Sequence, residues 1–320
     1  MRGAGGGSEL PARPSQHGLM PASKPGPAAI PRRALVLLVL LTLVWGTNWP
    51  LFPLVMREIS VWTFRAFSVP IAGLVLLGVA RARGHSLAIP RGDWLRFLVA
   101  TFAYMLVWNI ASTYAAILIP SGQGALLGFT MPLWVALISW AVLDERMSRR
   151  LLLALALGVL AVGMLMVPGF GAYTEAPLGV ASGLLAAIGW AVGTLIIKRH
   201  RWQTPVLVLT GWQLLLTALP IIAGAFVLGE GRWFMPSWQT LAVAAYITLV
   251  PMCIGNVSWF AIVGLLPANV AGLSSVMVPV VAMIAGALMH GEPLGPWQVA
   301  AMLCCVASLS LTLSQPATSP

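Results

Sequence analysis

Residues 101–145 read TFAYMLVWNIASTYAAILIPSGQGALLGFTMPLWVALISWAVLDE, and residues 248–292 read TLVPMCIGNVSWFAIVGLLPANVAGLSSVMVPVVAMIAGALMHGE. The two stretches align without a gap at an offset of 147 residues. In a chain this apolar, leucine coincides with leucine by chance. Identical threonine, asparagine, proline and glutamate residues rarely coincide at one fixed offset. The chain therefore contains an internal duplication. The matched pairs are Thr101 and Thr248, Asn109 and Asn256, Pro120 and Pro267, Pro132 and Pro279, and Glu145 and Glu292.

The composition indicates a membrane protein. Of the 320 residues, 59% are hydrophobic and 8% are charged. A soluble domain carries roughly 25% charged residues, so this chain has too few charges to cover a water-facing surface of its size. Its apolar surface must face lipid, and one polytopic membrane domain fits the length better than two soluble domains.

The net charge of +10 does not indicate nucleic-acid binding. The basic residues stand in short clusters between long apolar runs, whereas nucleic-acid binding needs a continuous basic face. Cys253, Cys304 and Cys305 all lie in apolar runs and suit neither a structural disulfide nor a metal site. We therefore expect no nucleic-acid partner, no metal and no cofactor.

Ten segments are long and apolar enough to cross a membrane as helices of about 20 residues. A turn is predicted at Pro120–Gly122, between the third and fourth segments, and a matching turn at Pro267–Asn269. The segments cover approximately residues 34–54, 61–80, 95–117, 121–143, 150–168, 177–197, 204–228, 238–262, 268–289 and 295–314.

Arginine and lysine orient these segments in the membrane. With the N-terminus in the cytoplasm, the opposite side receives only Arg57 and Arg232, which is the positive-inside pattern. An even number of spans returns the C-terminus to the cytoplasm. The cytoplasmic side receives Arg32, Arg33, Arg81, Arg83, Arg91, Arg96, Arg146, Arg149, Arg150, Lys198, Arg199 and Arg201.

The two copies are predicted to have opposite orientations in the membrane. A copy has five segments, which is an odd number, so the second copy enters from the other side. The Arg-rich loop with Glu145 is then cytoplasmic and the loop with Glu292 is external. We expect an all-α polytopic membrane protein with ten transmembrane helices in two inverted five-helix repeats, an arrangement typical of secondary transporters.

The predicted organisation has four parts. Residues 1–31 are rich in Gly, Pro, Ala and Ser and are expected to form a disordered cytoplasmic tail, within which Met20 is an alternative start to Met1. The first repeat covers residues 32–168 and the second covers residues 177–314. Residues 315–320 form a short cytoplasmic tail.

Several motifs resemble those of the EamA-type transporters of the drug/metabolite transporter superfamily. Trp45-Gly46-Thr47-Asn48-Trp49 is similar to the Trp-Gly-x-Asn signature of that family's first helix, and Trp62–Arg65 is similar to its second-helix segment. Pro132 before Asp144-Glu145, and Pro279 before Gly291-Glu292, resemble the end of each repeat. The second copy departs from the pattern, because Gly189-Trp190-Ala191 replaces the signature and Trp212-Gln213 stands near the equivalent of Arg65.

The resemblance implies a transporter of the inner or plasma membrane that moves small metabolites by alternating access, often outward. It also implies a central cavity between the two halves. An amino-acid-like or other small organic solute is the expected cargo, and the lipid bilayer is the expected surroundings. A homodimer is compatible with the sequence. The candidate substrate-binding residues are Asn48, Tyr104, Asn109, Trp190, Asn256 and Trp259.

Asn109 and Asn256 are the strongest candidates among these residues. An unpaired amide in hydrocarbon costs about 2–7 kcal/mol, so each side chain must face the protein interior or a cavity. They either contact substrate or hold helices together by hydrogen bonds. Met105, Asn109, Ser112 and Ala116 share one predicted helix face, which indicates a cavity wall or close helix packing.

Arg65 is the basic residue placed inside a span, about five residues from its external end. It could contact substrate or a gate, extend outward to the interface, or pair with Glu58. Pro132 and Pro279 are predicted to break moving helices, with a tolerated kink as the alternative. Among the tryptophans, some of the deeper ones are expected to line a cavity and others to face lipid: Trp45, Trp108, Trp190, Trp212 and Trp259.

No catalytic residues are predicted. His17, His85, His200 and His290 all lie outside the spans, and the sequence contains neither paired mid-membrane carboxylates nor a P-loop. The alternatives to a transporter are a membrane-embedded enzyme acting on lipid-linked substrates and a non-transporting permease subunit.

Overall fold

The computed structural model describes residue 3 and residues 32–143, 149–166, 176–228, 235–256, 258 and 268–313, and within these ranges every regular element is a helix. The prediction of an all-helical membrane protein is confirmed over this part of the chain. The predicted tails, apart from Gly3, lie outside the described residues, as do Glu145, Trp259 and Pro267.

The helices follow the predicted apolar segments closely. In the first half they are α1 (Arg32–Asn48), the 3-10 turn η1 (Trp49–Leu51), α2 (Phe52–Met56), α3 (Val61–Ala82), the 3-10 turn η2 (Arg91–Asp93), α4 (Trp94–Thr101), the π-helical turn η3 (Phe102–Leu106), α5 (Val107–Leu118), α6 (Ser121–Gly128), α7 (Met131–Leu143) and α8 (Arg149–Met166). In the second half they are α10 (Pro177–Arg199), α11 (Val206–Leu228), α12 (Trp238–Ile247), the π-helical turn η5 (Thr248–Ile254), α14 (Ala268–His290) and α15 (Pro296–Leu313).

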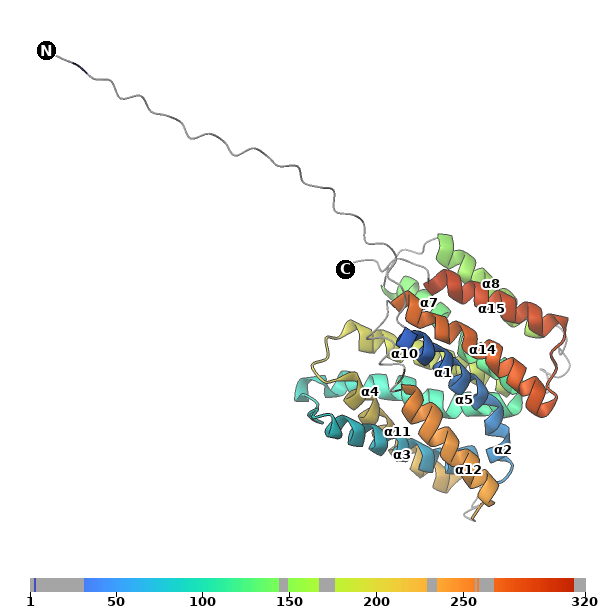
Figure 1. Ribbon diagram of the computed structural model, residues 1–320, viewed down its shortest axis with the longest axis horizontal. Helices are drawn as coiled ribbons and strands as arrows, with labels where there is room; N and C mark the ends of the chain where they lie inside the picture. Colours follow the sequence, from blue (N-terminus) through green and yellow to red (C-terminus); the bar gives the residue numbers. More distant parts are fainter. Residues whose placement is uncertain are drawn as a thin grey trace.

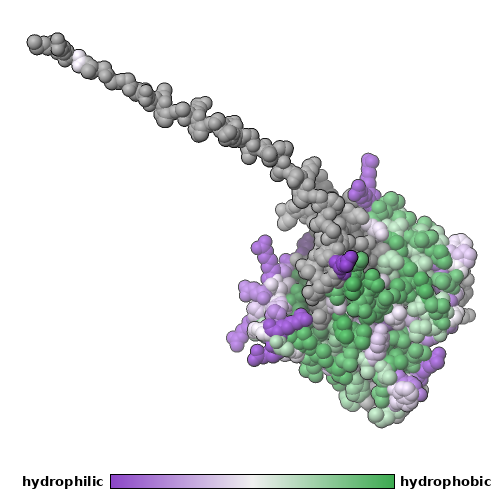
Figure 2. All heavy atoms as spheres, viewed as in Figure 1, coloured by the Kyte–Doolittle hydropathy of each residue, from purple (hydrophilic) through white to green (hydrophobic). Residues whose placement is uncertain are grey.

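Many of these helices are suited to a lipid environment. Over the described residues, six helical segments are long and apolar enough to cross a membrane, and four shorter apolar helices accompany them. Figure 2 shows a broad apolar face with hydrophilic side chains gathered towards its margins. Leu74, Phe226 and Val227 are among the large apolar side chains that are mostly exposed on the protein surface. A hydrocarbon solvent explains such exposure, which water would oppose.

The four most extensive helix pairs of the described residues join the two halves of the chain. α1 packs on α14, α3 on α11, α5 on α10 and α8 on α15, so each pair combines a helix before residue 167 with one after residue 176 (Figure 1). Small residues permit this close approach. A Cβ atom on Gly73 of α3 would lie 3.0 Å from the carbonyl oxygen of Gly211 on α11.

The two matched prolines have different surroundings. α6 ends at Gly128 and α7 begins at Met131, so a helix break directly precedes Pro132. Pro279 instead lies inside α14, which continues without interruption from Ala268 to His290, so the predicted break is absent there. The neighbouring Val278 and Ala282 are fully buried. Their burial favours an intact helix even though proline removes one backbone donor.

Candidate functional site

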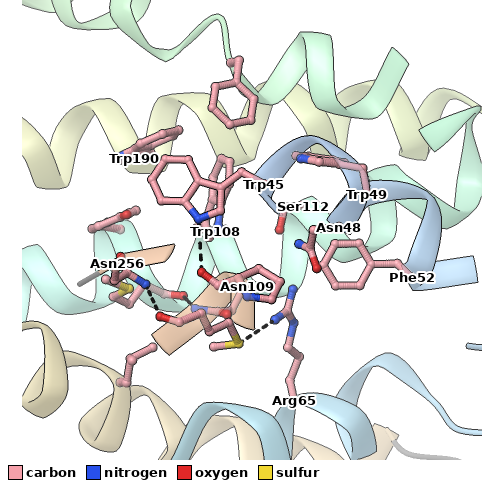
Figure 3. Close-up of a pocket in the computed structure, with 16 residues that line it drawn as sticks. Trp45, Asn48, Trp49, Phe52, Arg65, Trp108, Asn109, Ser112, Trp190 and Asn256 are labelled. Atoms are coloured by element: carbon pink, nitrogen blue, oxygen red, sulfur yellow. Dashed lines mark hydrogen bonds between the residues drawn. The ribbon is translucent and has the colours of Figure 1, made fainter. Parts of the chain in front are cut away.

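A cavity of about 100 Å³ lies among helices from both halves of the chain (Figure 3). Its walls come from α1 to α3, η3, α5, α10, α11, η5 and the ends of the elements beside them. Trp259 lies outside the described residues. Arg65 and the other candidate substrate-binding residues line this cavity, whereas Pro132 and Pro279 do not: the lining candidates are Asn48, Arg65, Tyr104, Asn109, Trp190 and Asn256.

An aromatic wall closes one side of the cavity. The rings of Trp108 and Trp190 meet edge to face, with their centroids 4.7 Å apart, and Trp190 stacks on Tyr104 with centroids 5.9 Å apart and planes 8° from parallel. Phe129 lies 5.7 Å from Trp190, and Trp49 lies 6.2 Å from Trp108. Edge-to-face and stacked pairs of this kind stabilise a rigid apolar surface.

Asn109 and Asn256 have the same local geometry. The side-chain Nδ2 of Asn109 donates to the carbonyl oxygen of Met105 at 2.8 Å, and Nδ2 of Asn256 donates to the carbonyl oxygen of Met252. Met105 and Met252 are themselves separated by the 147-residue offset. Each of these bonds stays within one helical segment, so it does not join two helices as the interhelical alternative predicted.

A π-helical turn precedes each asparagine. η3 and η5 occupy matched positions in the two halves, and each contains the methionine that accepts the asparagine amide. A π-helical turn bonds i to i+5 and disturbs the regular backbone ladder, and such turns are frequent at functional sites. The asparagine amides therefore stabilise backbone carbonyl groups within irregular turns that line the cavity.

Arg65 reaches the cavity from α3. Its Nε and Nη2 donate to Thr113 Oγ1 at 2.9 and 2.5 Å, and the Thr113 hydroxyl donates in turn to the carbonyl oxygen of Asn109 at 2.9 Å. The guanidinium carbon lies 4.9 Å from the ring centroid of Phe52 and 5.2 Å from that of Phe64. Arg65 is 3% exposed, so outward extension to the interface does not occur.

Glu58 does not pair with Arg65. Its carboxylate accepts hydrogen bonds from the backbone N–H and the hydroxyl of Ser237, at 2.6 and 2.7 Å, in front of α12. These bonds lower the pKa of the Glu58 carboxyl from its ordinary value. The carboxylate therefore holds the start of α12 beside the turn that precedes α3.

A second carboxylate joins the halves near the end of α14. Glu292 Oε1 accepts the backbone N–H of Ser121 at 2.7 Å, and Oε2 accepts that of Gly122 at 3.2 Å. Both N–H groups belong to the free N-terminus of α6, where negative charge is favourable. These bonds extend from the loop after α14 to the opposite half of the chain.

Asn48, which lines the cavity, carries an acceptor without a donor. Asn48 Oδ1 is buried and has no hydrogen-bond partner in the described part of the chain. A buried polar atom in this state is unfavourable unless water or a ligand supplies a partner. Asn48 lies beside the guanidinium group of Arg65 in Figure 3.

The remaining lining residues were not singled out as site residues from the sequence. Trp45 and Trp108 belong to the deep tryptophans of the sequence, and both line the cavity. Trp212 is equally deep in its apolar segment, but its indole N–H donates to the Leu87 carbonyl and it does not line the cavity. Of the helix face predicted from the sequence, Met105 of η3 and Ser112 of α5 line the cavity beside Asn109, while Ala116 packs in the core. The additional residues are Trp45, Trp49, Phe52, Met105, Trp108, Ser112, Phe129, Leu214, Pro251 and Met252.

Metal-binding groups do not gather in the described residues, where no set of three or more His, Cys, Asp or Glu side chains could hold an ion. The cavity instead offers a cation, amide groups and aromatic rings. Groups of this kind can bind and orient a small solute.

Comparison with known proteins reveals relatives along almost the whole chain. It is 25% identical over 282 residues to the uncharacterized transporter YvbV of Bacillus subtilis, covering 87% of this chain and 91% of that one. It is also 25% identical over 287 residues to a protein of Salmonella typhimurium named "Probable amino-acid metabolite efflux pump", covering 87% and 93%. A solved structure described as the crystal structure of a protein has a TM-score of 0.63 at 20% identity, over 87% of this chain and 95% of that one, so the two share a fold.

The model of the EamA-like transporter family matches two stretches, residues 32–167 and 177–314. The family and the relatives named for their activity are transporters and not enzymes, as the sequence predicted, so the alternative of a membrane-embedded enzyme is wrong. The chain is a multi-pass membrane protein that belongs to the EamA-like transporter family.

Proposed function

We propose that this protein is a secondary transporter that exports small organic metabolites by alternating access. In this proposal ten transmembrane helices form two inverted five-helix repeats, both termini are cytoplasmic, and the cavity in Figure 3 is the substrate site. The substrates are amino-acid-like or similar small polar solutes.

One observation carries the proposal: matched asparagines from the two halves, together with Arg65, line a single cavity. Secondary transporters bind substrate at the interface between repeats, where irregular helices expose backbone groups. Asn109 and Asn256 each follow a π-helical turn at corresponding positions, which fits that arrangement. The aromatic wall supplies the apolar surface that orients a small ligand.

The inverted arrangement is supported by the charge pattern and by helix pairing. Arginine and lysine concentrate in loops that the inverted topology assigns to the cytoplasm. The four most extensive helix pairs of the described residues each combine one helix from each stretch matched by the family model. Outward transport is supported by the relatives of Salmonella typhimurium and Escherichia coli whose printed names describe efflux pumps.

The test compares metabolites outside cells that overexpress the wild-type chain with those outside cells expressing the double variant Asn109→Leu, Asn256→Leu. The matched control is Thr101→Val, Thr248→Val. Thr101 and Thr248 also bond to the carbonyl four residues earlier, on Phe97 and Ala244, but they do not line the cavity.

We expect at least one small organic compound to accumulate outside wild-type and control cells, and not outside cells with the asparagine variant. Equal accumulation with the asparagine variant, at equal protein level, would remove these residues from the substrate site. A wild-type profile equal to that of the empty vector, followed by no uptake into proteoliposomes, would contradict the transport proposal itself.

A further inference from the structure

We infer that the substrate is a small organic monocarboxylate with a compact apolar body, and that Arg65 is the residue that recognises its carboxylate. This inference rests on the proposed transport function and names the substrate class of the same cavity. The starting point is the charge of Arg65, which is buried beside the cavity with only neutral groups around it.

The neighbours of Arg65 leave its positive charge uncompensated. Thr113 accepts two of its N–H groups, Met252 Sδ lies 3.7 Å from Nη1 as a weak acceptor, and the rings of Phe52 and Phe64 face the guanidinium carbon. Aromatic faces attract a cation but carry no net negative charge.

The acidic residues of the described chain are occupied elsewhere. Glu58 binds Ser237, Glu292 binds the N-terminus of α6, and Asp93 lies 2.6 Å from His200 Nε2. Each of these three carboxylates is thus committed to a contact other than Arg65. A buried cation in a membrane protein is unfavourable without a counter-charge, and the cavity beside the guanidinium provides room for an anion.

A carboxylate fits this position better than a larger or more highly charged anion. One guanidinium carries one positive charge and offers a planar pair of N–H donors that matches the two oxygens of a carboxylate. The other polar groups around the cavity are neutral amides and a hydroxyl, Asn48, Asn109, Asn256 and Ser112. A dianion such as a phosphate monoester would therefore keep an unpaired charge.

The opposite side of the cavity determines the rest of the substrate. Figure 3 shows Arg65 rising from α3 towards Asn48, while Trp108 and Trp190 lie on the far side. A ligand held by Arg65 would extend an apolar body towards this aromatic wall. The volume of about 100 Å³ favours a compact body over a drug-sized one.

Asn48 adds a preference at the position next to the carboxylate. Its Oδ1 is buried and has no partner among the described residues, so a substrate that brings an amino or hydroxyl donor against this oxygen would satisfy it. A plain carboxylate would leave this oxygen without a partner. We expect the donor-bearing acid to bind about tenfold more tightly, the difference that one good hydrogen bond makes.

The experiment measures the thermal unfolding midpoint of the purified full chain in detergent at neutral pH, with four probes of similar size. 3-Methylbutanoate carries the carboxylate alone, L-valine carries the carboxylate and an ammonium group, 2-methylpropan-1-amine carries only the ammonium group, and 3-methylbutanamide is neutral. A ligand that binds the folded state raises the midpoint. We expect the two carboxylates to raise it and the other two probes to have no effect.

Arg65→Met distinguishes recognition from a structural role. The substitution removes a buried charge without leaving an opposite charge unpaired, and Thr113 keeps its bond to the Asn109 carbonyl. The ligand-free midpoint should therefore stay the same or rise, while the shift caused by 3-methylbutanoate disappears. Arg65→Lys, which keeps the charge but loses the planar donor pair, should restore part of the shift. Asn48→Leu should abolish the advantage of L-valine over 3-methylbutanoate.

The inference is overturned if the amide or the amine raises the midpoint as much as 3-methylbutanoate, if Arg65→Met retains the shift, or if no probe shifts the wild type. A lower ligand-free midpoint in Arg65→Met would also overturn it by indicating a structural role. None of these results decides the transport proposal, because the extracellular metabolite comparison detects exported compounds of any charge.

Discussion

Glu292 accepts the backbone N–H of Ser121 at 2.7 Å across 171 positions of sequence. The bond joins the residues directly after α14 to the first residue of α6, and so connects the two stretches matched by the family model. A carboxylate at a helix N-terminus satisfies donors that have no partner within the helix. The contact closes one end of the interface between the halves.

Substitution of Glu292 should weaken this closure. Glu292→Ala leaves the N–H groups of Ser121 and Gly122 without their acceptor, which should lower the free energy of unfolding by about 1–3 kcal/mol. Glu292→Gln keeps one acceptor oxygen and should lose less. Thermal unfolding of both purified variants measures the order, and equal stability of Ala and wild type would contradict a structural contribution from the bond.

Trp190→Ala should change selectivity for substrate size. Trp190 contacts Tyr104, Trp108 and Phe129, so its removal enlarges the cavity from the side of the aromatic wall. The lost contacts should cost about 3–5 kcal/mol of stability. In competition assays in proteoliposomes, larger solutes should gain relative to small ones, while Trp190→Phe should keep the wild-type order. An unchanged order in Trp190→Ala would show that this ring does not limit substrate size.

Asn109→Leu and Asn256→Leu should destabilise the protein to a similar degree. Each removes the donor to a carbonyl in a π-helical turn, on Met105 or Met252, and should lower the free energy of unfolding by about 1–3 kcal/mol. Denaturant unfolding of the single variants tests the match between the halves. A loss confined to one variant would show that the two turns do not depend equally on their asparagines.

Glu58 should make the start of α12 sensitive to acid. The Ser237 bonds lower the pKa of its carboxyl below the ordinary 4.5, so their stabilisation is fully present above that pH. It is lost as the pH falls through the lower pKa of the folded state. Unfolding midpoints measured between neutral and acidic pH should fall less steeply for Glu58→Gln than for wild type. Parallel curves would show that another group dominates the acid response.

The sequence predicted helix positions well because apolar length alone determines them. The matched asparagines were identifiable because an amide within an apolar segment must face the protein interior or a cavity. The orientation of each helix was harder to predict. Trp108 and Trp212 look equivalent in the sequence, yet only Trp108 lines the cavity. Which side of a helix faces the cavity depends on helix packing and on turns such as η3, which shift the 3.6-residue period.

The partner of Arg65 was likewise outside the reach of sequence reasoning. Glu58 stands seven positions earlier and was a reasonable partner, but it caps α12, a helix from the other half. Thr113 carries no distinguishing signal in the sequence and bonds to Arg65 because α3 and α5 meet at this point. Contacts between distant segments required the three-dimensional structure.

The matched positions of the two π-helical turns bear on the history of this chain. A π turn accommodates one more residue than the α-helical turn it replaces. η3 and η5 each contain such a turn, and the two halves still align around them without a gap at 147 residues. The simplest history places the extra residue in a single ancestral unit before its gene was copied and fused. The irregular turn is then older than the two-copy protein and was inherited by both halves.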